Sequence, residues 1–290
     1  MRLLVVGGDG MLGHRLLVQL APVHDVRVTL RRPLAAYAPY RLYSERNAFP
    51  GVDVRDEAAV RGVLARFRPE AVVNAAGIVK QRPEATQSIP SIQVNALFPH
   101  RLALACRETG ARLVHLSTDC VFSGRRGGAT EASEPDAQDL YGRTKLLGEV
   151  DDGACVVLRS SIVGLELANR RGLVEWFLAR RGGTVRGWRH AVWSGLSTAE
   201  MTRVIDRVLG RHPELTGLWH VASEPVSKYD LLRRLAGHLG RDVRVEPDDS
   251  LRCDRSLDAG RFRQATGWEP PTLDEMLGEL AGEIREREAT

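Results

Sequence analysis

The sequence is poor in cysteine and contains no long apolar run. Its 290 residues include 4 cysteines, Cys106, Cys120, Cys155 and Cys253, and these form neither a CxxC pair nor a metal-ligand spacing. We therefore expect separate reduced thiols and no metal site. No segment approaches the length of a membrane span, and the first apolar run leads within a few residues into a glycine-rich loop, which leaves no room for a signal peptide. These absences predict a cytoplasmic protein with no membrane association.

The chain also lacks a strong charge of one sign. It has 41 Lys+Arg against 37 Asp+Glu, a formal net charge of +4, and its arginine pairs are scattered along the sequence. A nucleic-acid surface would normally show a clustered basic stripe with interleaved aromatic residues, which is absent here. We therefore expect no nucleic-acid partner. The small positive excess would suit an anionic small substrate, but charge alone does not decide this.

Short apolar runs alternate with helical periodicity along the first half of the chain. Because the runs are continuously apolar, they predict buried parallel strands at 3–6, 26–30, 71–74, 113–117, 156–159 and 218–222. Between them, Val94, Leu97, Phe98, Leu102 and Ala105 are expected on one helix face, and Met201, Val204, Ile205, Val208 and Leu209 on another. This alternation predicts an α/β fold with a Rossmann-type doubly wound parallel sheet.

The pattern loosens after about residue 160, where Gly-, Arg- and Trp-rich stretches appear. We interpret these as a smaller, discontinuous substrate-binding lobe. The predicted division assigns residues 1–163 and 192–222 to the dinucleotide-binding core, and residues 164–191 and 223–290 to the lobe.

A glycine-rich loop follows the first predicted strand. It comprises Gly7, Gly8, Asp9, Gly10, Met11, Leu12 and Gly13, in the spacing G-x-x-G-x-x-G. Glycines permit a tight turn and a close approach to a pyrophosphate, and the helix expected at 11–20 would present free N–H groups to that anion. An ordinary glycine-rich turn is the alternative. The position of this loop directly after the first strand of an α/β chain favours a dinucleotide cofactor.

The second predicted strand is followed by Arg31 and Arg32. NAD enzymes usually carry an acidic residue at this point to bind the ribose 2′-hydroxyl, whereas two guanidiniums suit a 2′-phosphate. NADPH is therefore the predicted cofactor, with NADH as a second option. A solvent-facing arginine pair is the alternative interpretation.

Further cofactor contacts are expected where strands end. Asp53 and Val54 precede a helical run from 57 to 67, for which Asp56 is the better capping candidate. The small residues Asn74, Ala75, Ala76 and Gly77 close a strand, as is needed where backbone approaches a ribose and a nicotinamide ring. Asn95 and Ser117 are also expected to contact the cofactor, although for Asn95 a structural or helix-start role outweighs direct catalysis.

Tyr141 and Lys145 are the most informative pair in the chain. They lie four residues apart on an expected helix, downstream of the strand-end trio Ser117, Thr118 and Asp119. A free phenol with a pKa near 10 is a poor proton donor at neutral pH, and a lysine one turn away would lower that pKa. Tyr141 would then protonate the alkoxide formed as hydride arrives, Thr118 would hydrogen-bond the carbonyl, and Lys145 would also hold the nicotinamide ribose. The pattern Y-x-x-x-K often occurs by chance in helices. Here it follows the glycine loop and Thr118 in the sequence, and this order makes chance a weak explanation.

Together these motifs resemble the extended short-chain dehydrogenase/reductase superfamily. Within it the chain is similar to the dTDP-4-dehydrorhamnose reductase-like group, which reduces 4-keto-6-deoxy nucleotide sugars. The segment from Ser117 to Gly124 resembles that group's Ser-Thr-Asp-Tyr-Val-Phe-x-Gly, and the likeness continues through 217–223, 225–230 and 256–262. The resemblance implies a nucleotide-sugar substrate in deoxysugar or polysaccharide biosynthesis.

Two segments depart from the group's pattern, and both bear on the substrate. Cys120 stands where those reductases commonly have tyrosine, and residues 78–82, which contain Lys80, also differ. The residues expected to contact substrate are Lys80, Asp119, Cys120, Trp188, Trp193 and Arg261. For the two tryptophans, packing within the protein is the stronger alternative.

These observations predict an NADPH-dependent reductase of a nucleotide-linked 4-keto sugar, with a homodimer as one expectation for its assembly. One alternative is a nucleotide-sugar epimerase or dehydratase of the same superfamily. The dehydratases usually follow the Thr-Asp pair with glutamate, where this chain has Cys120. The other alternative is a non-catalytic nucleotide-binding regulatory subunit. Such proteins tend to lose the tyrosine or the lysine, and both are present here.

Overall fold

The computed structural model describes residues 1–80, 83–168, 170–240 and 243–289. By its internal contacts the chain divides into two compact units. The first comprises Met1–Ser117, Gln138–Leu158 and Thr202–Leu218, and the second comprises Thr118–Ala137, Arg159–Met201 and Trp219–Thr290. The predicted core and lobe use other boundaries: residues 118–137, 159–163, 192–201 and 219–222 of the predicted core fall in the second unit. The assignment of the predicted ranges to cofactor binding and to substrate binding remains a prediction.

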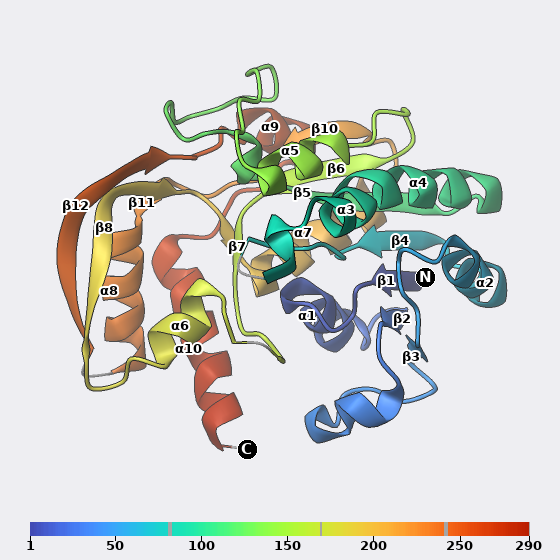
Figure 1. The fold of residues 1–290 in the computed structure, drawn as a ribbon, viewed down its shortest axis with the longest axis horizontal. Helices are drawn as coiled ribbons and strands as arrows, with labels where there is room; N and C mark the ends of the chain where they lie inside the picture. The colour runs from blue at the N-terminus through green and yellow to red at the C-terminus, as the bar shows by residue number, and fades with distance from the viewer. Residues whose placement is uncertain (81–82, 169, 241–242, 290) are drawn as a thin grey trace. The chain divides into compact units, whose positions relative to one another are not determined.

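The elements follow one another as repeated strand and helix units (Figure 1). Up to residue 118 they are β1 (Arg2–Val6), α1 (Met11–Leu20), β2 (Asp25–Leu30), η1 (Leu34–Tyr40), β3 (Ala48–Pro50), α2 (Glu57–Phe67), β4 (Ala71–Asn74), η2 (Pro83–Thr86), α3 (Ser88–Ser91), η3 (Ile92–Leu97), α4 (Phe98–Thr109) and β5 (Arg112–Thr118). They continue with η4 (Asp119–Val121), α5 (Leu140–Leu147), β6 (Val156–Ser160), β7 (Ile162–Val163), α6 (Leu173–Leu178), β8 (Thr184–Trp193), β9 (Leu196–Ser197), α7 (Thr198–Arg211), β10 (Gly217–His220), β11 (Val226–Ser227), α8 (Lys228–Leu239), β12 (Arg244–Asp254), α9 (Gly260–Thr266) and α10 (Leu273–Ala289).

A seven-stranded sheet confirms the predicted Rossmann-type fold. Its strand order is β10-β6-β5-β4-β1-β2-β3, and β1 pairs in parallel with both β2 and β4. Each predicted strand of this sheet is present within two residues of its predicted bounds, and β3 was not predicted. Because β1 lies between β2 and β4, the strand order reverses at the loop that follows β1. Open α/β sheets bind their ligands at such a reversal.

The first unit buries the two faces of its strands under different helices. Leu4 and Val6 of β1 belong to a core cluster with Val60 and Leu64 of α2 and Leu102 of α4. The alternate side chains of β1 are also fully buried, and α1 packs against β1 and β2. Because successive side chains of a strand point to opposite faces, α1 covers the face opposite to α2 and α4.

Most helix predictions are confirmed, with one correction at Leu97. All five residues predicted for the inner face of α7 are buried, and the predicted helices at 11–20 and 57–67 have the observed bounds. Leu97 was expected to be buried but is 41% exposed. The segment η3 is a π-helix, whose wider turn adds a residue and rotates Leu97 out of the stripe that Val94 and Phe98 continue.

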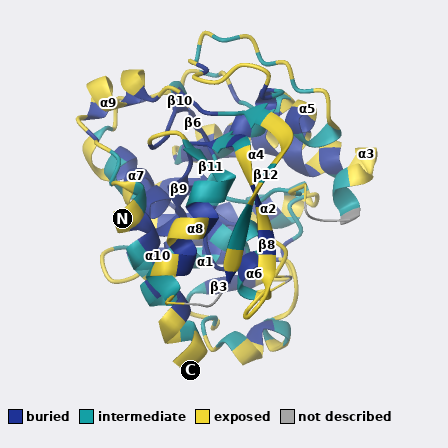
Figure 2. Cartoon of the chain, turned by 90° about the vertical axis from the view of Figure 1, so that its left-hand side faces the viewer, coloured by how far each residue is buried: buried dark blue, intermediate teal, exposed yellow. Residues whose placement is uncertain are grey.

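The second unit contains structure that the sequence pattern did not reveal. Strand β8 pairs with β11 and with β12 in a three-stranded sheet, against which α8 packs. Figure 2 shows many exposed residues along β8 and β12. On the covered side, Leu231 and Leu235 of α8, Leu280 of α10 and Trp193 of β8 share a buried cluster.

Within the described ranges, none of the helices combines the length and the apolar composition needed to cross a bilayer.

Candidate functional site

The glycine loop after β1 is held by close backbone contacts. Gly7 has a φ of +89°, and a Cβ there would lie 2.9 Å from the Cα of Ala76. A Cβ at Gly13 would lie 2.0 Å from the Gly7 carbonyl oxygen. The Gly7 N–H donates to the Thr29 hydroxyl at 3.1 Å, and the Gly10 N–H to the Gly7 carbonyl at 3.1 Å. The loop therefore has the tight turn expected of a dinucleotide cradle.

Helix α1 begins at Met11 in a form that suits an anion. Its N-cap is Gly10, which supplies no side-chain hydrogen bond, and its first turn holds no acidic residue. The leading N–H groups of a helix lack partners within the helix and carry its positive dipole end. Leu12 itself is buried in the core, so only its backbone is available to a ligand. These features fit a pyrophosphate between the loop and α1.

Two tyrosines fasten the segment after β2 to this loop. The Tyr37 hydroxyl donates to the Asp9 carboxylate at 2.8 Å and accepts the Arg32 N–H at 3.3 Å. The Tyr43 hydroxyl donates to the Gly8 carbonyl at 2.7 Å. Burial, together with the negative charge of Asp9, raises the pKa of Tyr37 to about 12, so its phenol stays protonated. Asp9 is thus engaged by a neutral phenol rather than by a cation.

Arg31 and Arg32 lie exposed at the end of β2, as the NADPH prediction requires. Arg31 is close enough to Asp53 to help lower the pKa of that carboxyl group, although the hydrogen bond from Arg55 has the larger effect. Asp53 forms an ion pair with Arg55 at 2.5 Å. Its carboxylate is therefore already engaged, and a contact from residue 53 to a cofactor would compete with Arg55.

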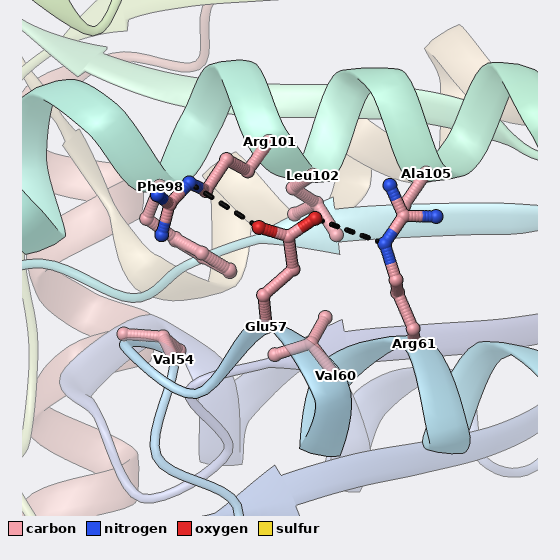
Figure 3. Close-up of a pocket in the computed structure, with 8 residues that line it drawn as sticks. All are labelled: Val54, Glu57, Val60, Arg61, Phe98, Arg101, Leu102 and Ala105. Carbon is pink, nitrogen blue, oxygen red and sulfur yellow. Dashed lines mark hydrogen bonds and ion pairs between the residues drawn. The ribbon is translucent and has the colours of Figure 1, made fainter.

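Val54 lines a shallow pocket between α2 and α4 (Figure 3). Glu57 lies in the middle of this pocket and pairs with Arg61 at 3.0 Å and Arg101 at 3.3 Å. Phe98 is among the apolar residues of its wall. Because the Glu57 carboxylate is held in two ion pairs and none of the predicted catalytic residues lines this pocket, the site is built around α5 instead.

The ends of β4 and β5 are joined by buried polar side chains. Asn74 is fully buried, with its Oδ1 accepting the Ala76 N–H at 3.2 Å and its Nδ2 facing His115 Nδ1 at 3.1 Å. The Ala75 N–H donates to the Val6 carbonyl at 3.0 Å, and Gly77 follows without a side chain. Asn74 therefore fixes the course of the backbone over which the nicotinamide would lie.

Asn95 is a structural residue in the π-helix. Its Oδ1 accepts the Ile78 N–H at 2.8 Å, and its Nδ2 donates to the Ile78 carbonyl at 2.9 Å and to the Thr144 hydroxyl at 3.4 Å. One buried amide thus ties the segment after Gly77 to α5. These hydrogen bonds agree with the structural role that the sequence suggested for Asn95. A contact between Asn95 and the cofactor remains a prediction.

Helix α5 carries Tyr141 in its first turn. Its N-cap, Asp139, accepts the Gly142 N–H at 2.9 Å and also accepts from Lys80 Nζ at 2.8 Å. The same Lys80 ammonium lies 5.8 Å from the centre of the Tyr141 ring. Lys80 was predicted to bind substrate, and the structure places it beside the predicted acid. Its neighbours Gln81 and Arg82, also part of the divergent segment, lie outside the described residues.

Lys145 follows one turn later and is 5% exposed. Its Nζ donates to the Leu116 carbonyl of β5 at 2.6 Å. Burial lowers the pKa of Lys145 to about 8, and the charge of Glu149 opposes that effect. The ammonium is therefore fixed on a backbone carbonyl and still mostly charged at neutral pH.

Two residues around this lysine were not predicted. Glu149 accepts a hydrogen bond from the Ser117 hydroxyl at 2.5 Å. Burial lowers the pKa of His115, and the nearby Lys145 ammonium adds a smaller effect in the same direction. The spacing of Lys145 and Glu149, four residues apart, was a signal that sequence reasoning had available. No pattern in the sequence pointed to His115.

Thr118 and Asp119 belong to the second unit. The Thr118 hydroxyl donates to the Asp119 carboxylate at 3.2 Å and accepts the Cys120 N–H at 3.2 Å. Burial raises the pKa of Asp119, while the nearby Arg255 and Lys228 lower it. The same Lys228 has its own pKa lowered by burial. Cys120, which follows Asp119 in the sequence, is partly exposed.

The three remaining predicted substrate contacts have different surroundings within the second unit. Trp193 is 3% exposed and its indole N–H donates to Ser161 at 2.9 Å, which agrees with the packing alternative. Trp188 is 41% exposed on β8 and remains available for stacking. Arg261 stacks on Trp219, with its guanidinium carbon 3.9 Å from a ring centre, and lies 3.9 Å from a carboxylate oxygen of Glu131, so a substrate contact from Arg261 remains a prediction.

One family model matches most of the chain, and 4-keto-sugar reductases are among its relatives. Residues 1–258 match the sequence model of the family described as RmlD substrate binding domain. A dTDP-4-keto-6-deoxy-D-glucose reductase of Streptomyces niveus is 28% identical over 86% of this chain and 84% of its own length. A probable dTDP-4,6-dihydroxy-2-methyloxan-3-one 4-ketoreductase of Streptomyces antibioticus is 31% identical over 85% of this chain and 80% of its own.

A solved structure shares the fold over nearly the whole chain. It is a dTDP-4-dehydrorhamnose reductase of Bacillus anthracis in complex with NADP, 21% identical in sequence, with a TM-score of 0.78. The match covers 97% of this chain and 99% of that one.

Proposed function

The chain belongs to the RmlD substrate binding domain family, and on that premise we propose that it is an NADPH-dependent reductase of a 4-keto (6-deoxy) nucleotide-activated sugar. The observation that carries the proposal is the arrangement on α5: Tyr141 lies one turn before Lys145, and Lys145 is buried and held on the Leu116 carbonyl. The relatives named as 4-keto-sugar reductases support the substrate class. Such an enzyme would serve deoxysugar or polysaccharide biosynthesis, and a cytoplasmic site of action is part of the proposal.

The residues that would hold the cofactor fit a dinucleotide. The uncapped start of α1 at Met11 would bind the pyrophosphate, and the exposed Arg31 and Arg32 would bind the 2′-phosphate of NADPH. NADH remains a second option because the arginines lie on the surface and an exposed charge contributes only modestly. When bound, the nicotinamide supplies the hydride.

The proton comes from this chain. Tyr141 would donate its phenolic proton to the carbonyl oxygen of the sugar as negative charge develops there. The positive charge of Lys145 would stabilise the phenolate that remains. The Lys80 ammonium lies 5.8 Å from the ring centre, but its charge is paired with the Asp139 carboxylate.

Thr118 would act as the second donor to the carbonyl. In the structure its hydroxyl proton is directed at Asp119. A hydroxyl has one proton, so donation to a substrate requires that bond to be released. Protonation of Asp119, whose pKa is raised by burial, would make that release easier.

The test of this function is the fate of the hydride. The protein is incubated with dTDP-, UDP- and GDP-linked 4-keto-6-deoxy sugars and NADPH carrying deuterium at the transferred position. A reductase oxidises one NADPH per sugar and places one deuterium at carbon 4. An epimerase or dehydratase first removes a hydride from a C4 carbinol and then returns it internally, so the corresponding 4-hydroxy nucleotide sugars are included. Product formed from these without deuterium or net cofactor oxidation would support that alternative. Tight nucleotide binding without turnover on any of the three would support a regulatory subunit.

A homodimer is the proposed assembly. Leu97 and Leu104, seven residues apart on η3 and α4, are 41% and 45% exposed, and Leu147 is 65% exposed. His100 of α4 bonds the Leu147 carbonyl at 2.7 Å, so these leucines lie on neighbouring segments. Sedimentation equilibrium of the protein and of Leu104→Glu tests the proposal. A monomer in both cases contradicts it.

A further inference from the structure

Glu149 stands where local helix preferences do not favour an acid. Helix α5 ends at Leu147, Gly148 is its C-cap, and the Glu149 N–H donates to the Leu146 carbonyl at 3.1 Å. The C-terminal end of a helix carries partial negative charge and disfavours carboxylates. The side chain of Glu149 must therefore have a favourable partner outside the helix.

That partner is the end of β5. The Ser117 hydroxyl, itself buried, donates to Glu149 Oε1 at 2.5 Å, which is in the range of short, charge-assisted hydrogen bonds. The preceding residue, Leu116, accepts from Lys145 Nζ at 2.6 Å. Two consecutive residues of one strand thus fix the carboxylate and the ammonium.

Among the described residues, the other groups near Lys145 do not balance its charge. His115 on β5 is fully buried, and burial together with the Lys145 charge holds the pKa of His115 well below its usual value, so its ring is neutral. Tyr141, one turn earlier on α5, is neutral in its acid form. Asn95 of η3 bears no charge, and His100 of α4 faces the Leu147 carbonyl rather than this lysine.

Glu149 does act on the ammonium. It follows Lys145 by four residues, just beyond the end of α5, and the contacts with Ser117 and Leu116 hold the two groups at the same end of β5. Burial of Lys145 lowers its pKa to about 8, and Glu149 is the group that works against this.

We propose that Glu149 is a positioning residue of the reduction: held by the Ser117 hydroxyl, its carboxylate is the counter-charge that keeps the buried Lys145 ammonium charged and fixed on the Leu116 carbonyl. The proposal rests on the proposed function only where it assigns Lys145 to the reaction. The electrostatic part concerns this chain alone and is measurable without cofactor or substrate.

The sequence makes that measurement direct, because it contains 3 lysines, Lys80, Lys145 and Lys228. The protein is labelled with ¹³Cε,¹⁵Nζ-lysine, and each signal is followed by NMR from pH 6 to 11, with Lys145→Arg identifying the Lys145 signal. In Glu149→Gln the pKa of Lys145 should fall by about one unit, a tenfold loss of proton affinity. Ser117→Ala, which frees the carboxylate without removing it, should shift it less and in the same direction.

Internal and matched controls accompany the titration. The Lys80 and Lys228 signals should titrate as in the unchanged protein. Glu45→Gln, which removes the same charge from an exposed position, should leave Lys145 unaffected. An unchanged Lys145 pKa in Glu149→Gln, or an equal shift in Glu45→Gln, overturns the proposal.

Kinetics supply the second readout. Glu149→Gln should retain most turnover near pH 6, where Lys145 is charged in either case, and lose about tenfold relative to the unchanged protein on the alkaline side. Glu149→Asp should recover part of that loss. A drop of equal size at every pH indicates a merely structural role and contradicts the proposal. If the unchanged protein reduces no keto sugar, the proposed function fails while the titration still decides the role of Glu149.

Discussion

Among single residues, Tyr141 is the group whose removal tests the chemistry most directly. Tyr141→Phe deletes one oxygen, so the protein should fold and bind NADPH while turnover falls roughly 10²- to 10⁴-fold. Thermal unfolding and NADPH fluorescence titration check the first expectation, and initial rates check the second. Turnover close to that of the unchanged protein would identify another proton donor.

The buried Lys145 should lower the free energy of unfolding of the protein. Its pKa is about 8 in the folded chain against a usual 10.5, so the unfolded chain holds the proton more tightly. Below pH 8 Lys145 is charged in both the folded and the unfolded chain, and the folded chain is destabilised by the full desolvation of that charge. This destabilisation decreases as the pH rises from 8 to 10.5, an interval in which only the unfolded chain still binds the proton. The difference corresponds to roughly 3 kcal/mol, from which the lost Leu116 hydrogen bond subtracts about 1.

Lys145→Met should therefore be inactive and yet about 1–3 kcal/mol more stable at pH 7, an advantage that disappears above pH 10. Urea unfolding at pH 7 and pH 10 measures both values. A variant that is less stable at pH 7 would show that the folded protein does not pay a desolvation cost at this position.

The two arginines after β2 should set the cofactor preference. If they bind the 2′-phosphate, NADPH binds more tightly than NADH, and Arg31→Asp narrows or reverses that preference by roughly 1–3 kcal/mol through the lost charge-assisted contact. The ratio of dissociation constants for the two cofactors is the measurement. Equal affinities in the unchanged protein would remove the basis for assigning NADPH.

At the scale of elements, the packing of α1 against the glycine loop is what positions the cofactor cradle. A methyl group at Gly13 would meet the Gly7 carbonyl oxygen at 2.0 Å and the Gly8 Cα at 2.9 Å, whereas one at Gly62 in α2 meets nothing within 4 Å. Both glycines lie inside helices, so the two substitutions by alanine share the same intrinsic helix preference.

We expect Gly13→Ala to displace the loop, destabilise the protein and weaken NADPH binding at least tenfold. Gly62→Ala should stabilise it by about 0.5–1 kcal/mol with unchanged affinity. Chemical denaturation and cofactor titration of the pair make the comparison. Normal NADPH affinity in Gly13→Ala would mean that the loop geometry does not control the site.

For the molecule as a whole, buried His115 should make stability sensitive to mild acid. Its pKa is held below the usual value, so as the pH falls below about 6.5 the unfolded chain takes up a proton that the folded chain refuses. The free energy of unfolding should then decrease by about 1 kcal/mol between pH 6.5 and 5.5. Asp119, whose pKa is raised, acts in the opposite direction at lower pH.

The slope identifies the group responsible. In His115→Asn the unfolding free energy should be nearly flat over that interval, whatever its absolute value. His190→Asn, which removes a partly exposed histidine, is the matched control. Parallel slopes in all three proteins would exclude His115 as the source.

The sequence alone determined the parallel sheet and its chemistry-bearing motifs, because both depend on short-range patterns. A strand buried on both faces must be continuously apolar, as at Leu3–Val6, and a phosphate loop needs its glycines at close spacing. Tyr141 and Lys145 lie one turn apart, so their partnership was visible before any tertiary structure. Asp56 was recognised as a cap for the same reason, and it accepts the Ala59 N–H at 3.1 Å.

Tertiary structure decided everything that joins distant residues or breaks a regular period. Strands β8 and β12 are about half exposed, and β12 is rich in charge, so no long apolar run marked either strand. The π-helical turn at Leu97 shifted a stripe that an ideal helix would have continued. The hydrogen bond from Ser117 to Glu149 spans 32 residues. The role of the Glu149 carboxylate depends on the burial of the Lys145 ammonium, and burial is a property of the folded chain.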